Sequence, residues 1–201
     1  MEPQGATGDR VYLALSAAGA KTPLDILPDR TSTLAGTTGG ADYILITTRS
    51  LGWDAAGTPR PWLSSLLSLR QGQGLRAVAV DAEDIGDEFG YGLATPQAVR
   101  DFLAHAYANW ARPAPKYVLL VGDGTNDPKN NNQEPDEGSF AYLPAYLGFT
   151  VYMGETAKDD WFVRASGSGA APDLHIGRLP ASSVAQAEAM AAKIVAYEQA
   201  A

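Results

Sequence analysis

The stretch that decides the fold class is Tyr117-Val118-Leu119-Leu120-Val121-Gly122-Asp123-Gly124-Thr125-Asn126-Asp127-Pro128. Its apolar part, Tyr117–Val121, is too short for a helix and is rich in the residues that suit a buried strand. Two carboxylates, Asp123 and Asp127, follow directly after it. Ligands of open α/β sheets bind outside the carboxyl ends of the strands, so these two residues become the first candidates for a functional site.

Strands and helices are predicted to alternate on both sides of this stretch. Proline suits the first turn of a helix, which places helix starts at Pro61 and Pro96, and Thr95 and Ser183 are suitable N-terminal caps. Gln186, three residues after Ser183, completes a capping-box pattern. The predicted elements are strands at 11–16, 43–47, 75–81, 117–121 and 174–176, and helices between Pro61 and Gly72, from Pro96 through Trp110, and from Ser183 to the end.

This order predicts an α/β fold with a mostly parallel sheet covered by helices on both faces. Residues 1–40 are predicted to be an N-terminal strand and linker segment, because 31–40 has the Thr, Ser and Gly composition of a loop. Residues 41–201 are predicted to form the α/β domain. Residues 122 to about 150 are predicted to form a long irregular stretch, and a loop of this length in a compact domain is usually either functional or mobile.

Composition excludes several classes of function. The formal net charge of −8 argues against nucleic acid or anionic membrane as a partner. The sequence also lacks a run of about 18 apolar residues, so no membrane insertion is expected. With no cysteine, the chain has no disulfide, no thiolate metal site and no cysteine nucleophile of its own. The polar start and the helix that continues to the last residue suggest a segment of a longer protein.

Acidic residues cluster after several predicted strands. We predict a divalent cation among Asp123, Asp127, Asp159 and Asp160, because two acidic loops that follow neighbouring strands would converge at one edge of the sheet. Oxygen ligands without a thiolate favour calcium over zinc. The alternative is that these acids, and the cluster at 81–92, are turn formers exposed to solvent, and the turn-forming tendency of Asp and Gly favours it.

Common enzyme motifs are mostly absent. Gly122–Asp127 resembles the magnesium-binding motif of haloacid-dehalogenase-type phosphatases, but the Asp-x-Asp that those enzymes require does not occur. The chain also has no Gly-x-Ser-x-Gly elbow, no Gly-x-Gly-x-x-Gly turn and no Gly-Lys-Ser/Thr phosphate loop, which argues against a serine hydrolase and against nucleotide binding. His105 is predicted at the surface, and His175 is predicted to be packed or hydrogen-bonded.

An ordered set of segments resembles the gingipain-like cysteine peptidase family. Each segment alone is a weak signal, but the set in this order is specific. The matching segments are residues 41–47, 81–92, 95–103 and 117–127, then Lys158-Asp159-Asp160-Trp161-Phe162-Val163, then Pro172-Asp173-Leu174-His175-Ile176-Gly177-Arg178-Leu179-Pro180, and finally the helix that reaches Tyr197-Glu198.

The resemblance implies a caspase-like α/β fold in a secreted or surface-attached bacterial peptidase, and therefore an extracellular or cell-surface location. It also implies that this segment is the first, noncatalytic subdomain, because the family's catalytic His and Cys lie later in the chain. Neither His105 nor His175 has the family's catalytic setting, so no catalytic residue carries over. We expect the chain alone to be inactive and its partner to be the downstream catalytic subdomain. The alternative is a stand-alone module that binds a divalent cation or a small ligand.

Overall fold

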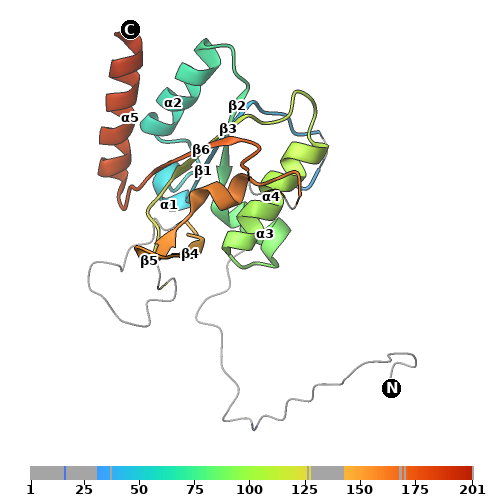
Figure 1. Cartoon of the computed structure of the whole chain (residues 1–201). Helices are drawn as coiled ribbons and strands as arrows, with labels where there is room; N and C mark the ends of the chain where they lie inside the picture. The colour runs from blue at the N-terminus through green and yellow to red at the C-terminus, as the bar shows by residue number, and fades with distance from the viewer. Residues whose placement is uncertain are drawn as a thin grey trace. The chain divides into compact units, whose positions relative to one another are not determined.

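Four parallel strands form the central sheet (Figure 1). They lie in the order β2-β1-β3-β6, and the register places Tyr43 of β1 opposite both Ala77 and Tyr117. The strands are β1 at Tyr43–Thr47, β2 at Ala77–Asp81, β3 at Tyr117–Val121 and β6 at His175–Leu179. The predicted parallel α/β architecture is confirmed, and the sequence places each of these strands to within a few residues.

Helices α1 (Arg49–Gly52), α2 (Pro61–Gly72) and α5 (Val184–Gln199) pack on one face of the sheet. Their contribution to the buried core on this face comes from Leu51, Trp62, Leu63, Leu66, Ala187 and Ala191. Tyr43 and Leu45 of β1 point into the same core. The fully buried residues of α5 are two alanines, which let the helix approach the sheet closely, and its larger apolar side chains, Val184, Met190, Ile194 and Val195, pack against the core while partly exposed.

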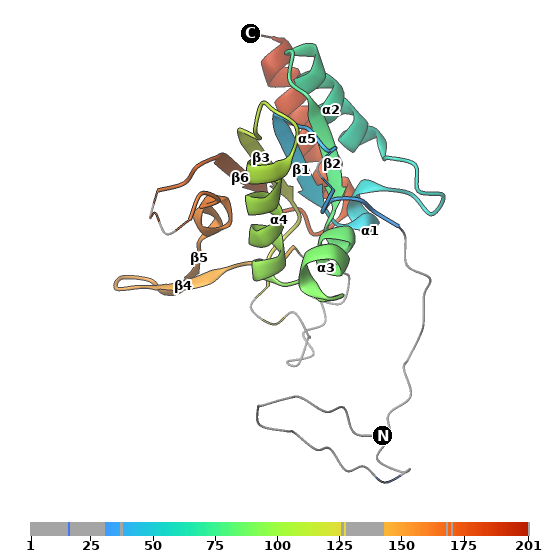
Figure 2. The ribbon, with the colours of Figure 1, turned by 90° about the vertical axis from the view of Figure 1, so that its right-hand side faces the viewer.

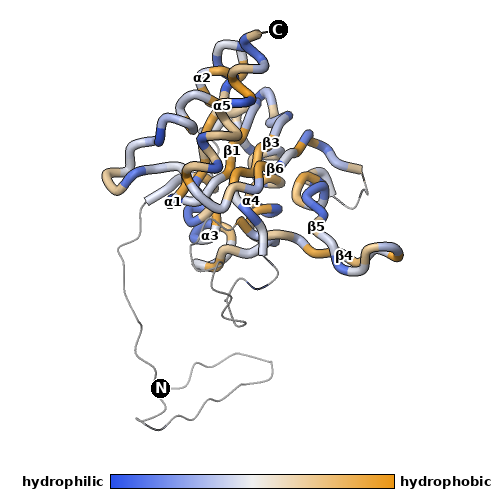
Figure 3. The backbone as a smooth tube through the Cα atoms, turned by 90° about the vertical axis from the view of Figure 1, so that its left-hand side faces the viewer, coloured by the Kyte–Doolittle hydropathy of each residue, from blue (hydrophilic) through white to orange (hydrophobic). Residues whose placement is uncertain are grey.

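Helices α3 (Ala82–Gly90) and α4 (Pro96–Asn109) cover the opposite face, together with the 3₁₀ helix η2 (Asp159–Val163). Figure 2 shows α3 and α4 in front of the sheet. Ile44 and Ile46 of β1 point into this second core, where Phe102 of α4 and Phe162 of η2 are fully buried. The alternation of β1 side chains between two cores is what a sheet covered on both faces requires, and Figure 3 shows the hydrophobic residues gathered along the strands.

Helix starts follow the capping signals of the sequence. The side-chain oxygen of Thr95 accepts a hydrogen bond from the Ala98 N–H at 3.2 Å, and that of Ser183 accepts one from the Gln186 N–H at 3.3 Å. The capping box is displaced by one residue, because Gln186 Oε1 accepts from the N–H and hydroxyl of Ser182. The capping signals therefore predicted both helix starts correctly. The difference is that the Gln186 side chain bonds to Ser182 and not to the cap residue Ser183.

A two-stranded antiparallel hairpin, β4 (Leu147–Thr150) with β5 (Gly154–Ala157), follows the long connection after β3. It was not predicted. Its base is fixed by a hydrogen bond from the Lys158 N–H to the Tyr146 carbonyl at 2.9 Å. The rings of Tyr146 and Trp161 stack beside that bond with their centroids 4.0 Å apart.

The structure describes residues 31–36, 38–125, 127, 143–167, 169 and 171–200, together with Ser16. The chain divides into two units, Met1–Arg30 and Thr31–Ala201, and the second of these is the compact domain described above. The strand predicted at residues 11–16 lies outside the described residues except for its last position, and the predicted division after residue 40 remains a prediction. Among the described residues, no helix combines the length and apolar character needed to span a membrane.

Candidate functional site at the carboxyl edge of the sheet

The four parallel strands end at one edge of the sheet, because the register aligns Thr47 with Asp81 and Val121, and Val121 with Leu179. This carboxyl edge is where α/β proteins place their ligands. The sheet order reverses between β1 and β3, where a ligand crevice would be expected. Here Thr47 and Val121 are both fully buried, and the Thr47 hydroxyl donates to the Val121 carbonyl at 2.7 Å. The Thr47 side chain therefore bridges the ends of β1 and β3 at this point.

Asp81 and Asp84 form a carboxylate pair beside this crevice. Asp81 is only 3% exposed, accepts the Glu83 N–H at 3.1 Å and lies 3.5 Å from Arg49 Nη1. Burial, followed by the nearby Asp81 charge, raises the pKa of Asp84 to about 6, although Arg49 opposes this effect. The acids of residues 81–92 are predicted from the sequence to be solvated turn formers. For Asp81 and Asp84 this interpretation is wrong, because Asp84 lies in helix α3 and the Asp81 side chain caps that helix.

Replacing Asp84 with asparagine is expected to stabilise the fold at pH 7.5 by about 1–2 kcal/mol. This free energy is smaller than the full pKa difference implies, because solvent partly screens the exposed side chain. The folded carboxyl keeps its proton up to about pH 6, whereas the unfolded one loses it near 3.8. The stability that Asp84 contributes is therefore complete below about pH 4 and is lost as the pH rises through 6. Urea unfolding of wild type and Asp84→Asn at pH 4.5 and 7.5 measures this. A stability difference that does not change with pH would contradict it.

Asp123 and Asp127, two of the predicted calcium ligands, lie in the turn after β3. The Asp123 carboxylate accepts the Gly124 N–H at 2.8 Å, and its carbonyl accepts the Leu143 N–H at 2.8 Å. Asp127 is buried, and its own N–H donates to the Thr125 hydroxyl at 2.9 Å. These contacts are those of turn-forming residues that hold a loop against the sheet.

The other two predicted ligands, Asp159 and Asp160, are paired with arginines. Asp159 accepts two hydrogen bonds of 2.9 Å, from Nε and Nη2 of Arg178. Asp160 accepts one of 2.5 Å from Arg164 one helical turn later. A cation at these carboxylates would have to compete with a guanidinium at each of them.

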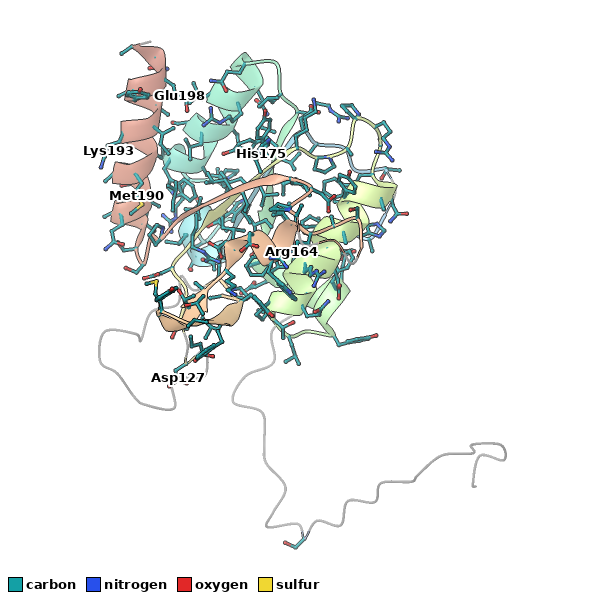
Figure 4. The ribbon with its side chains drawn as sticks, viewed as in Figure 1. Asp127, Arg164, His175, Met190, Lys193 and Glu198 are labelled. Carbon is teal, nitrogen blue, oxygen red and sulfur yellow. The ribbon has the colours of Figure 1, made fainter. Side chains whose placement is uncertain are left out.

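The four acids do not gather around one point in the part of the chain that the structure describes. The described residues contain no group of three or more His, Cys, Asp or Glu side chains that could hold a metal ion. Figure 4 shows Asp127 beyond the hairpin and well apart from Arg164, the partner of Asp160. A calcium ion at these positions therefore remains a prediction, which no contact of the structure supports.

Arg178 is the residue of this edge that sequence reasoning missed. From β6 it pairs with Asp159 of η2 and donates to the carbonyls of Gly122 and Pro144, each at 3.2 Å. It therefore ties the strand end, the turn after β3 and the base of the hairpin together. The predicted strand ends at residue 176, so Arg178 lies outside it, and the structure extends β6 to Leu179.

Neither histidine belongs to this edge. His105 lies in α4, half-buried, with its ring 5.5 Å from that of Phe89. His175 is exposed at the amino end of β6 and stacks on Tyr117 at 5.4 Å. Since the sequence has no cysteine, the edge offers charges and backbone groups that position loops, and no thiolate for covalent catalysis.

Comparisons with known proteins agree with this architecture. The model of peptidase family C25 matches residues 37–201. No curated protein matches the sequence. Among solved structures, dimeric latent PorU from Porphyromonas gingivalis is similar at 23% identity and a TM-score of 0.63, over 80% of this chain and 16% of that chain. The likeness concerns the fold, and this chain spans a small part of the length of PorU.

Proposed function

Because the chain belongs to peptidase family C25, we propose that it is the N-terminal, noncatalytic subdomain of a gingipain-like cysteine peptidase. The observation that carries the proposal is the absence of cysteine from a sequence that matches this family over residues 37–201. A thiolate nucleophile must then come from another segment. The parent protein would hydrolyse peptide bonds with a Cys and a His that lie downstream, outside the cell or on its surface.

Strand β6 offers a surface for that downstream subdomain. The His175 N–H donates to Lys116 and the Leu179 carbonyl accepts from Gly122, so the odd-numbered residues of β6 direct their backbone groups toward β3. Ile176 and Arg178 consequently direct theirs toward the open edge of the sheet. A parallel sheet is normally covered on both faces. Nevertheless, His175 and Gly177 are exposed, and a Cβ added at Gly177 would meet no atom within 4 Å.

The purified chain is expected to show no peptidase activity, because it carries no thiol and no histidine at the carboxyl edge of the sheet. A mixture of fluorogenic peptides with varied residues before the scissile bond tests this without assuming a specificity. The full parent polypeptide, assayed beside it, should hydrolyse at least one of these peptides and lose that activity on alkylation by iodoacetamide. Turnover by the chain alone that survives repurification and alkylation would refute the proposal.

A further inference from the structure

The turn of the β4–β5 hairpin carries a concentrated group of exposed apolar side chains, which we call the hairpin tip. Its members are Phe149, Val151, Tyr152 and Met153, with exposed fractions of 77%, 87%, 98% and 77%. Among the described residues, the other large apolar side chains with more than 60% exposure are Tyr91 and Leu93, which follow α3, and Tyr197 on α5. A contiguous apolar patch of this kind marks an interaction site more often than scattered residues do.

The tip is held away from the domain by a rigid base. The Tyr146 and Trp161 rings stack with only 5° between their planes, and the Arg100 guanidinium lies 4.6 Å above the Trp161 ring. Figure 2 shows the hairpin projecting from the sheet and the helices. A two-stranded ribbon is marginal on its own, so these base contacts are what fix the tip in its exposed position.

We propose that the hairpin tip is a self-association surface, at which two copies of this chain pack tip to tip about a two-fold axis. Four such side chains expose roughly 600 Å² per copy, so a symmetric pair buries at most roughly 1,200 Å², which reaches the lower limit for a specific interface. A two-fold axis lets one patch serve both partners.

Charge favours a second copy over an anionic surface. The chain has a formal net charge of −8, so most contacts between two copies bring like charges together. Residues 147–154 contain no charged side chain, and Glu155 is the first acid of β5. The tip is therefore a place where two copies meet without electrostatic repulsion, whereas an anionic membrane would repel the chain as a whole.

Backbone groups at the hairpin add to this surface. Because Tyr146 pairs with Lys158, the N–H and C=O groups of Leu147 and Phe149 face away from β5. The Lys158 ammonium reaches only the Phe149 carbonyl, at a long 3.4 Å. Among the described residues, the outer edge of β4 therefore directs backbone donors and acceptors away from β5 beside the apolar tip, and a second hairpin can pair with them.

Sedimentation velocity of the 201-residue chain tests the proposal, from about 5 to 200 μM, the range suited to a micromolar dimer. The wild type should shift from monomer to dimer with concentration, and Phe149→Ser with Tyr152→Ser should weaken the dimer at least tenfold. Tyr91→Ser with Tyr197→Ser is the matched control, since it removes two equally exposed rings elsewhere, and it should dimerise like wild type. A wild type that stays monomeric, or a control that loses the dimer equally, overturns the proposal.

A single introduced thiol gives an independent measurement, because the sequence has no cysteine. Tyr152→Cys should form a disulfide-linked dimer under mild oxidation, at a rate that rises with concentration and falls when Phe149→Ser is added. Tyr197→Cys, equally accessible on α5, should crosslink far more slowly. Equal crosslinking at both positions overturns the proposal. Flotation of the chain as a monomer with zwitterionic lipid vesicles also overturns it and assigns the tip to a lipid surface.

Discussion

Replacing Trp110 with alanine is expected to lower the free energy of unfolding by about 3–5 kcal/mol, the usual cost of removing a buried tryptophan. The side chain is 6% exposed, and its ring meets that of Phe102 edge-on at 5.5 Å. Its indole N–H donates to the Leu34 carbonyl at 3.0 Å. The substitution thus opens a cavity at the end of α4 and also removes the bond that Trp110 makes to Leu34. The hydrogen bonds from Ser32, Leu34 and Ala35 to the Glu88 carboxylate remain, so the segment before β1 is loosened and not released. Urea unfolding followed by circular dichroism measures the loss.

Trp110→Phe is the matched control, since it keeps an aromatic ring in the cavity and removes mainly the bond to Leu34. Its expected cost is nearer 1 kcal/mol from the hydrogen bond, with a further contribution from the smaller ring. Limited proteolysis should cut within residues 31–40 much faster in Trp110→Ala than in Trp110→Phe. If the two variants were equally stable, the ring packing would not be what holds this segment.

Arg178→Ala is expected to destabilise the fold by about 2–4 kcal/mol, because it leaves the Asp159 carboxylate partly buried without its cation. The two side chains are 12% and 24% exposed, so solvent replaces the lost partner only in part. The carbonyls of Gly122 and Pro144 lose their donor at the same time. Chemical unfolding of the variant and of wild type measures the difference.

Arg164→Ala provides the comparison, since Arg164 is also an arginine paired with an aspartate of η2. Asp160 is 44% exposed, and exposed pairs contribute about 0–1 kcal/mol. The Arg178 variant should therefore lose at least twice as much stability as the Arg164 variant. Equal losses would mean that the links from Arg178 to Gly122 and Pro144 add nothing.

The sheet could be predicted from the sequence because each strand is a short apolar run of its own, as at Tyr43–Thr47 and Tyr117–Val121. Helix α3 was missed because Ala82–Gly90 contains four acids and only Ile85 and Phe89 as large apolar residues. That pair is spaced by one helical turn and points into the core, but the acids and glycines of the segment favour a turn when it is considered alone.

The candidate site was harder to predict, because the residues that decide it are distant in sequence. The positions of Asp159 and Asp160 near a strand end could be anticipated. Their pairing could not, since Arg178 reaches Asp159 across 19 residues and its partners Gly122 and Pro144 lie further away. A cluster of carboxylates predicts a bound cation when only the sequence is considered. For Asp159 and Asp160 the cations are the guanidinium groups of Arg178 and Arg164.

Strand β1 contributes to both cores at once. All five of its residues are buried, with Ile44 and Ile46 in one core and Tyr43 and Leu45 in the other. Loss of packing in one core is expected to disturb the other, because the residues of the two cores alternate along this one strand and share its register. The helices on the two faces are therefore expected to unfold in one cooperative transition. The stacked rings of Tyr146 and Trp161 keep the base of the hairpin in place, and the part beyond that base, which belongs to neither core, is expected to have the lower free energy of local opening.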